Sequence, residues 1–92
     1  MEDKIRELLK KSDKWSLVDN KLVGKFEFTD YAEVRVFVGK IAAVADELNH
    51  HPTVTFSYNW VCVETTTHDQ GNSVTDKDVE LVTKILEQNI GS

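Results

Sequence analysis

The longest periodic stretch of the chain runs from residue 29 to residue 49. Thr29 or Asp30 can cap its start, and Glu33 follows Asp30 at the spacing of a capping box. Pro52 disfavours a helical conformation in the residue before it, so the helix should end near His50. Apolar residues recur three and four positions apart, which predicts a helix with one buried face formed by Val34, Phe37, Val38, Ile41, Val44, Ala45 and Leu48.

Two shorter helices are predicted at the ends of the chain. Residues 2–12 carry apolar side chains at helical spacing among charges, namely Ile5, Leu8 and Leu9. Residues 75–89 begin with Thr75 as a cap and have Asp78 three positions later. The buried face of this last helix should contain Val79, Val82, Ile85 and Leu86.

Alternating apolar and polar positions between the helices predict two hairpins. Residues 14–28 form the first, with Asp19-Asn20 as its turn pair and Gly24 as the site of a bulge. Residues 53–67 form the second, with its turn near Asn59. The whole order therefore predicts an α+β fold: a four-stranded, largely antiparallel sheet with three helices packed on one face, in the order α-β-β-α-β-β-α, as a single domain over residues 1–92.

The composition narrows the class of protein. A hydrophobic content of 40% and a charged content of 29% are ordinary for a soluble globular domain. The net charge of −5 argues against binding to a nucleic-acid backbone, and no apolar run is long enough to span a membrane. Cys62 is the only cysteine, and its apolar neighbours predict a buried, unreactive thiol. A lone thiol suits a reducing compartment, so we expect a cytoplasmic protein.

All three histidines lie near one corner of the predicted fold. If Asn59 and Trp60 are the two-residue turn of the second hairpin, His51 lies opposite His68, with their Cβ atoms about 5 Å apart. Asp46 and His50 are four residues apart on the long helix and share a face that is not the core stripe. A carboxylate and three imidazoles should therefore converge where the helix enters the hairpin.

Other interpretations of these residues stay open. A histidine at a helix end can be a structural cap, and histidine with carboxylate can bind zinc, although no His-x-x-x-His or cysteine spacing supports a metal here. Asp78 is fully explained as the acidic partner of the Thr75 cap. Tyr58 and Trp60 fit sheet packing better than ligand contact, and Glu64 fits a solvated strand position.

The arrangement of these residues resembles that of the pterin-4a-carbinolamine dehydratase family. Asp46 is followed after three residues by His50-His51-Pro52, after five more by Tyr58, after nine by His68 and after nine by Asp78. The stretch KWSLVDNKLVGKFEFTDY resembles the family's first hairpin and its entry into the long helix, and TDKD resembles the start of its last helix. There are two departures: Asp46 stands where the family most often has Glu, and the loop after His68 is about one residue longer.

The resemblance implies that the chain removes water from a 4a-hydroxy-tetrahydropterin to give the quinonoid dihydropterin, in the recycling of tetrahydrobiopterin. It implies His51, His68 and His50 as the catalytic histidines, with His51 as the acid at the 4a-hydroxyl group and His68 as the base, although the residues alone leave open which of these two is the acid. It also implies that His50, Asp46 and Asp78 bind or orient the pterin. No cofactor or metal is implied. Histidine chemistry fits, because a group with a pKa near 6.5 can give or take a proton at neutral pH.

The same resemblance implies interactions with other proteins. Members of the family act as homodimers or homotetramers, and an edge strand in a sheet this small needs covering. Some members are binding modules, either as the dimerisation cofactor of a transcription factor or as an assembly factor. A non-catalytic binding module is therefore the alternative to the enzyme, and it would not need the histidines.

Overall fold

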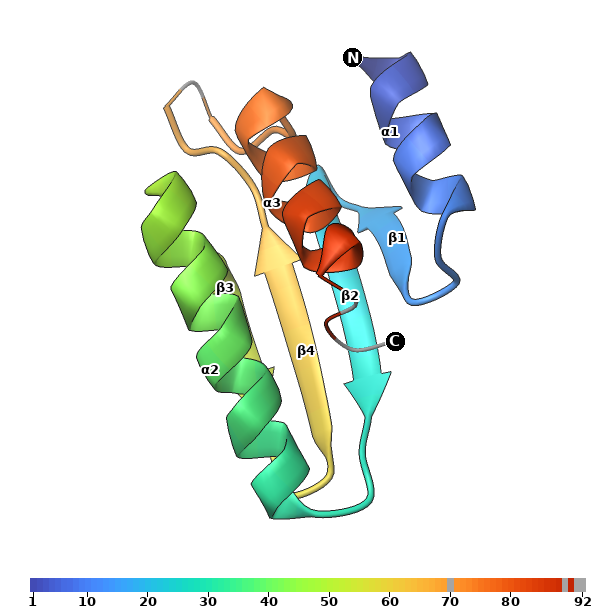
Figure 1. Cartoon of the computed structure of the whole chain (residues 1–92). Coiled ribbons are helices and arrows are strands. Elements are labelled where there is room, and N and C mark those ends of the chain that lie inside the picture. Colours follow the sequence, from blue (N-terminus) through green and yellow to red (C-terminus); the bar gives the residue numbers. More distant parts are fainter. Residues whose placement is uncertain (70, 89, 91–92) are drawn as a thin grey trace.

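The computed structural model describes residues 1–69, 71–88 and 90. Its elements are α1 (Glu2–Lys10), β1 (Trp15–Val18), β2 (Lys21–Glu27), α2 (Tyr31–Leu48), β3 (Thr53–Phe56), β4 (Trp60–Thr65) and α3 (Asp76–Glu87). The strands form one antiparallel sheet in the order β1-β2-β4-β3 (Figure 1). The predicted α+β fold and the predicted order of its elements are confirmed.

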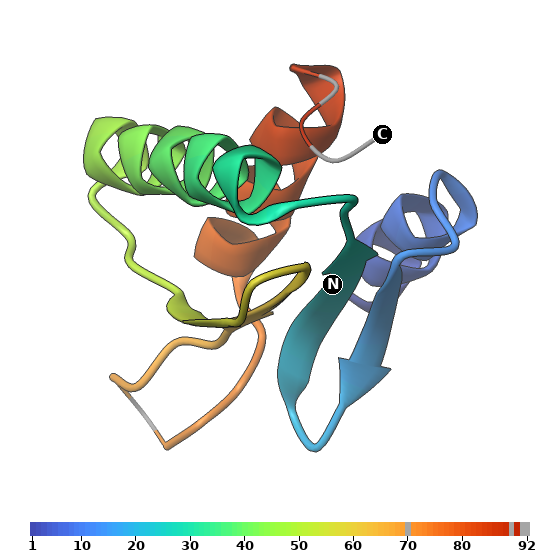
Figure 2. The same cartoon turned by 90° about the horizontal axis from the view of Figure 1, so that it is seen from below.

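The helices gather on one face of this sheet. Figure 2 shows α2 and α3 above the β3–β4 hairpin, with α1 beside them near β1. The face of the sheet toward the helices carries the side chains that form the buried centre of the core, among them Leu22, Phe26, Val61 and Val63. They meet the α2 stripe, in which Val34, Phe37, Ile41, Val44 and Ala45 are buried and Val38 and Leu48 are partly buried. Among the described residues no helix is long and apolar enough to cross a membrane.

The first hairpin confirms one turn prediction and overturns another. Asp19 and Asn20 both have positive φ, 49° and 65°, as a two-residue turn of this kind requires. Gly24 marks no bulge, because its pairing with Trp15 on one side and Val63 on the other continues an unbroken ladder. Glycine is needed for space instead: a Cβ atom there would lie 2.8 Å from the Trp15 ring.

Two predictions about burial are also corrected. Leu81 is fully buried on α3, although the predicted stripe left it out, whereas Val79 and Leu86 are only partly buried. Cys62 is partly exposed rather than buried in the core, because its position in β4 points away from the helices. Even so, burial, helped by the nearby Glu64 charge and opposed by Lys25, raises the pKa of its thiol.

Candidate functional site

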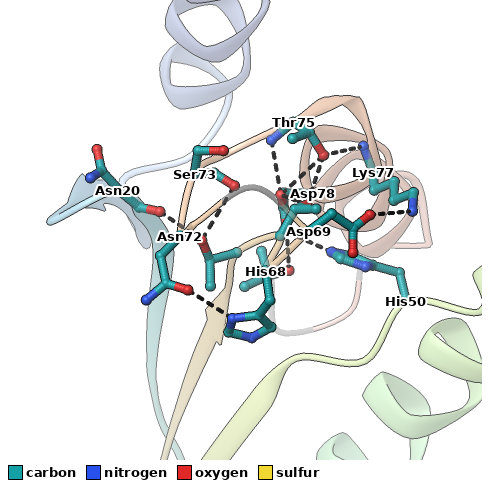
Figure 3. Close-up of polar contacts among 12 residues, drawn as sticks. Asn20, His50, His68, Asp69, Asn72, Ser73, Thr75, Lys77 and Asp78 are labelled. Carbon is teal, nitrogen blue, oxygen red and sulfur yellow. Dashed lines mark hydrogen bonds and ion pairs between the residues drawn. The ribbon is translucent and has the colours of Figure 1, made fainter.

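The candidate site is built around the carboxylate of Asp78, in the first turn of α3 (Figure 3). This side chain has no exposed surface. Its Oδ1 atom is 2.6 Å from Thr65 Oγ1 and 2.6 Å from Nε2 of His50. Its Oδ2 atom accepts hydrogen bonds from Thr67 Oγ1 at 2.7 Å and from the Thr75 backbone N–H at 2.9 Å. Four donors from three segments of the chain thus converge on one buried anion.

The hydroxyl groups around Asp78 have a fixed direction. The backbone N–H of Lys77 donates to Thr75 Oγ1 over 3.3 Å, and Thr75 Oγ1 lies 2.7 Å from Thr67 Oγ1. The single proton of Thr67 goes to Asp78, and the Thr75 hydroxyl lies farther from the same oxygen, at 3.5 Å, so the shorter contact has Thr75 donating to Thr67. A chain of donors therefore leads from the α3 N-terminus to the carboxylate. The predicted capping box of Thr75 and Asp78 is present, but it is only part of what Asp78 does.

Asp78 is held as a carboxylate. Burial acts to raise its pKa, but hydrogen bonds from Thr65, His50, Thr75 and Thr67 outweigh burial and lower the pKa below the ordinary aspartate value. An ionised carboxylate only accepts hydrogen bonds, so the proton between it and His50 belongs to Nε2 of the imidazole. The His50 side chain is 14% exposed. Its Nδ1 atom is therefore the nitrogen left to meet another molecule.

Asp46 has a different partner from the one its spacing suggested. Its Oδ1 atom lies 3.4 Å from His51 Nε2, and both side chains are largely exposed. His50, four residues after Asp46, is turned toward Asp78 instead. The cause is Asn49, which ends α2 in the left-handed region with φ of 52° and redirects the chain after it. An exposed contact of this length contributes little stability, so Asp46 is available to other partners.

His68 does not lie opposite His51 in the hairpin ladder. Phe56 pairs with Val61, and the Ser57 N–H donates to the Trp60 carbonyl over 3.0 Å, so Tyr58-Asn59 is the turn rather than Asn59-Trp60. This register, extended past β3 and β4, places position 51 opposite position 66. The predicted facing pair of histidines is wrong. The Nδ1 atom of His68 instead lies 2.7 Å from Oδ1 of Asn72 in the following loop.

Sequence reasoning missed the threonines that hold Asp78. Thr65 and Thr67 have the same parity as Val61 and Val63 in β4, so they continue its buried face beyond the apolar positions. That alternation was the available signal, because a hydroxyl at a core position needs a hydrogen-bond partner. Across the described residues, no three histidine, cysteine, aspartate or glutamate side chains gather as a metal would require.

The sequence matches, over residues 1–88, the family described as pterin 4 alpha carbinolamine dehydratase. The chain belongs to this dehydratase family. A relative from Sulfurisphaera tokodaii is 48% identical over 94% of this chain and 91% of its own length. A relative from Sulfolobus acidocaldarius is 43% identical over 91% of each chain. Both are named, provisionally, as pterin-4-alpha-carbinolamine dehydratases.

Two solved structures show what else the family fold carries. A Brucella melitensis protein described as a transcriptional coactivator/pterin dehydratase superposes with a TM-score of 0.83 at 31% identity, covering 100% of this chain and 97% of that one. A pterin dehydratase-like protein identified as a RuBisCO assembly factor in the alpha-carboxysome has a TM-score of 0.64 at 20% identity, covering 85% and 89%. The second likeness concerns the fold alone. The family fold thus occurs in proteins described by more than one role.

Proposed function

We propose that this protein catalyses the dehydration of a 4a-hydroxy-tetrahydropterin to the quinonoid dihydropterin and water. The observation that carries the proposal is the contact between His50 and the buried carboxylate of Asp78, at 2.6 Å, in a chain with all three histidines of the dehydratase pattern. A buried charge is costly unless it is fully hydrogen-bonded. An imidazole that binds a polar ring must point in a fixed direction, and the Asp78 carboxylate fixes the direction of His50.

The reaction needs two proton movements. The bond between C4a and its hydroxyl oxygen breaks as that oxygen receives a proton, and a ring nitrogen loses one. We assign the first transfer to His51 and the second to His68, both exposed side chains that a bound molecule can reach. His50 would present Nδ1 to the pterin and orient it. Asp46, itself exposed, would accept hydrogen bonds from the amide and amino groups of the ring.

In this proposal Asp78 positions His50 and does not contact the pterin itself. Its exposed fraction is zero, and both of its oxygens already accept hydrogen bonds. It would therefore act through His50, as the group that fixes which nitrogen carries the proton. Such positioning groups behind a histidine set both the tautomer and the direction of the ring.

The test generates the 4a-hydroxy-tetrahydropterin with an aromatic amino acid hydroxylase and follows its decay by ultraviolet absorbance. We expect the native chain to speed the decay, and His51→Ala or His68→Ala to lower the rate by about 10²–10⁴-fold. Thr53→Ala, an exposed position in β3 close to His51 in sequence, is the matched control and should keep the native rate. No acceleration by the folded native chain would refute the enzyme.

A binding role is the second candidate, and exposed aromatic side chains favour it. Phe56, Tyr58 and Trp60, around the β3–β4 turn, are 43%, 65% and 41% exposed. β3 is also an edge strand of four residues with no charge and no proline to block it. We propose that the chain forms a homodimer through this edge, either alone or as half of a tetramer. In the binding role, which is the alternative to the dehydratase, the exposed aromatic residues would contact a protein partner.

A further inference from the structure

The loop after β4 is folded back on itself by a pair of backbone hydrogen bonds. The Thr67 N–H donates to the Ser73 carbonyl over 2.9 Å, and the Ser73 N–H donates to the Thr67 carbonyl over 3.2 Å. Gly71 has φ of +80°, a conformation that glycine adopts without strain. The next pair inward from Thr67 and Ser73 is His68 and Asn72. The loop geometry therefore brings these two side chains face to face.

A separate contact fixes this loop against the rest of the sheet. The Thr66 hydroxyl lies 2.9 Å from the carbonyl oxygen of Asn20, in the β1–β2 turn, and 3.3 Å from the carbonyl of Ser73. Asn20 lies in the two-residue turn between β1 and β2, so this contact attaches the loop to the first hairpin. Successive residues in this extended segment point to opposite sides. Thr67 therefore reaches Asp78. His68, on the other side, reaches Asn72 (Figure 3).

The contact between His68 and Asn72, with the amide oxygen toward the ring, favours one tautomer of the imidazole. The Asn72 oxygen that lies 2.7 Å from Nδ1 can only accept a hydrogen bond, so Nδ1 must carry the proton. A neutral imidazole with its proton on Nδ1 has its lone pair on Nε2. Without such a partner an exposed imidazole exchanges its proton between the two nitrogens, and each nitrogen is a base for only part of the time.

We propose that Asn72 is a positioning residue for His68, holding the proton on Nδ1 so that Nε2 is always the bare nitrogen. The inference deepens the proposed dehydratase function, because it identifies Nε2 of His68 as the atom that takes the proton from the pterin ring. It also gives the two histidines opposite arrangements. His50 carries its proton on Nε2, facing Asp78, whereas His68 carries its proton on Nδ1, facing Asn72.

The test reads the tautomer directly, by nitrogen-15 NMR of the labelled full chain at a pH about two units above the ordinary histidine pKa of about 6.5. A protonated ring nitrogen resonates far from a bare one, and the spectrum of His68→Ala identifies the His68 signals. We expect Nδ1–H in the native chain and a mixture of tautomers in Asn72→Ala. Asn72→Asp retains an oxygen acceptor and should restore Nδ1–H. Asp69→Ala, which removes only an exposed ion pair with Lys77, should leave the signals unchanged.

The kinetic arm uses the same variants in the dehydratase assay. Asn72→Ala should lower kcat by about two- to fivefold, because Nε2 then carries the proton for part of the time, with little change in KM. Asn72→Asp should recover most of the rate. A native His68 with its proton on Nε2 would overturn the proposal whether or not the chain is a dehydratase. An inactive native chain with the expected tautomer would refute the dehydratase function and leave the Asn72 contact supported.

Discussion

Replacing Asp78 with asparagine should lower the free energy of unfolding by much more than the same change at an exposed aspartate would. Four donors point at this side chain: the hydroxyls of Thr65 and Thr67, the Thr75 N–H and Nε2–H of His50. Asparagine offers one oxygen and an NH₂ group in place of two oxygens. If the oxygen faces His50 and Thr65, the NH₂ group faces the Thr75 N–H, which then has no acceptor. If the amide is flipped, His50 must move its proton to Nδ1.

The size of the effect follows from these contacts. A hydrogen bond to a charged group contributes about 1.5–3 kcal/mol, and a buried donor left unpaired costs about 1–3 kcal/mol. Either orientation of the amide weakens at least one of the four contacts and removes the charge from all of them. We therefore expect the Asp78→Asn variant to lose about 2–3 kcal/mol of unfolding free energy. In a domain of this size that corresponds to a fall in Tm of about 10–20 °C.

Urea unfolding at neutral pH, followed by circular dichroism, measures this difference. Asp76→Asn is the matched control, because it makes the same chemical change two residues earlier on α3, at a side chain that is 71% exposed. Its side chain pairs with Lys4, at 3.1 Å, and an exposed pair of this kind contributes at most about 1 kcal/mol. A loss no greater in Asp78→Asn than in Asp76→Asn would refute the reasoning.

Acid should bring the native chain and the Asp78→Asn variant closer together. The folded state lowers the pKa of Asp78, through the hydrogen bonds that outweigh its burial. Its contribution to stability is therefore complete above the ordinary aspartate pKa of about 3.9 and is lost as the pH falls through the lower value of the folded state. Asparagine does not titrate. A stability difference that stays constant from neutral pH into strong acid would contradict this account of Asp78.

Two further changes test the sheet. Gly24→Ala should destabilise the fold by about 1–3 kcal/mol, because its Cβ atom would lie 2.8 Å from the Trp15 ring. Urea unfolding measures this loss, and an unchanged urea midpoint would show that the ring moves aside freely. Thr55→Lys places a charge on the β3 edge, which should prevent pairing of two chains there. Sedimentation equilibrium should give a mass of at least twice 10.5 kDa for the native protein and the mass of one chain for the variant. A native monomer would contradict the proposed edge pairing.

The fold was largely predictable because each element carried its own period. The α2 stripe repeats over about four turns, and the Asp19-Asn20 turn has the residue types that tolerate positive φ. The second hairpin shows the limit. Moving its turn from Asn59-Trp60 to Tyr58-Asn59 shifts the partner of each residue by two positions, so every side chain keeps its face. Alternation cannot distinguish two registers of equal parity, and neither turn contains a glycine that would choose between them.

The histidines and carboxylates of the candidate site were identified from the sequence, but their contacts, and the threonines around Asp78, were not. Sequence separation placed Asp46 beside His50, yet the left-handed Asn49 turned His50 toward Asp78 on another helix. Asp78 was recognised as a cap and as a family residue, but its link to His50 depends on how α3 packs against α2. Such a link between elements 28 residues apart has no local period to reveal it.

The double use of Asp78 has a consequence for how relatives of this chain should diverge. It closes the first turn of α3 and anchors His50, so a chain that loses it loses a part of its fold as well as a part of its site. His51 and His68, by contrast, are exposed and can be replaced at little cost to stability. A family member retained only as a partner for other proteins should therefore keep the aspartate and lose the exposed histidines. If the proposed function is right, the aspartate would mark members of the family and the exposed histidines would mark those that are dehydratases.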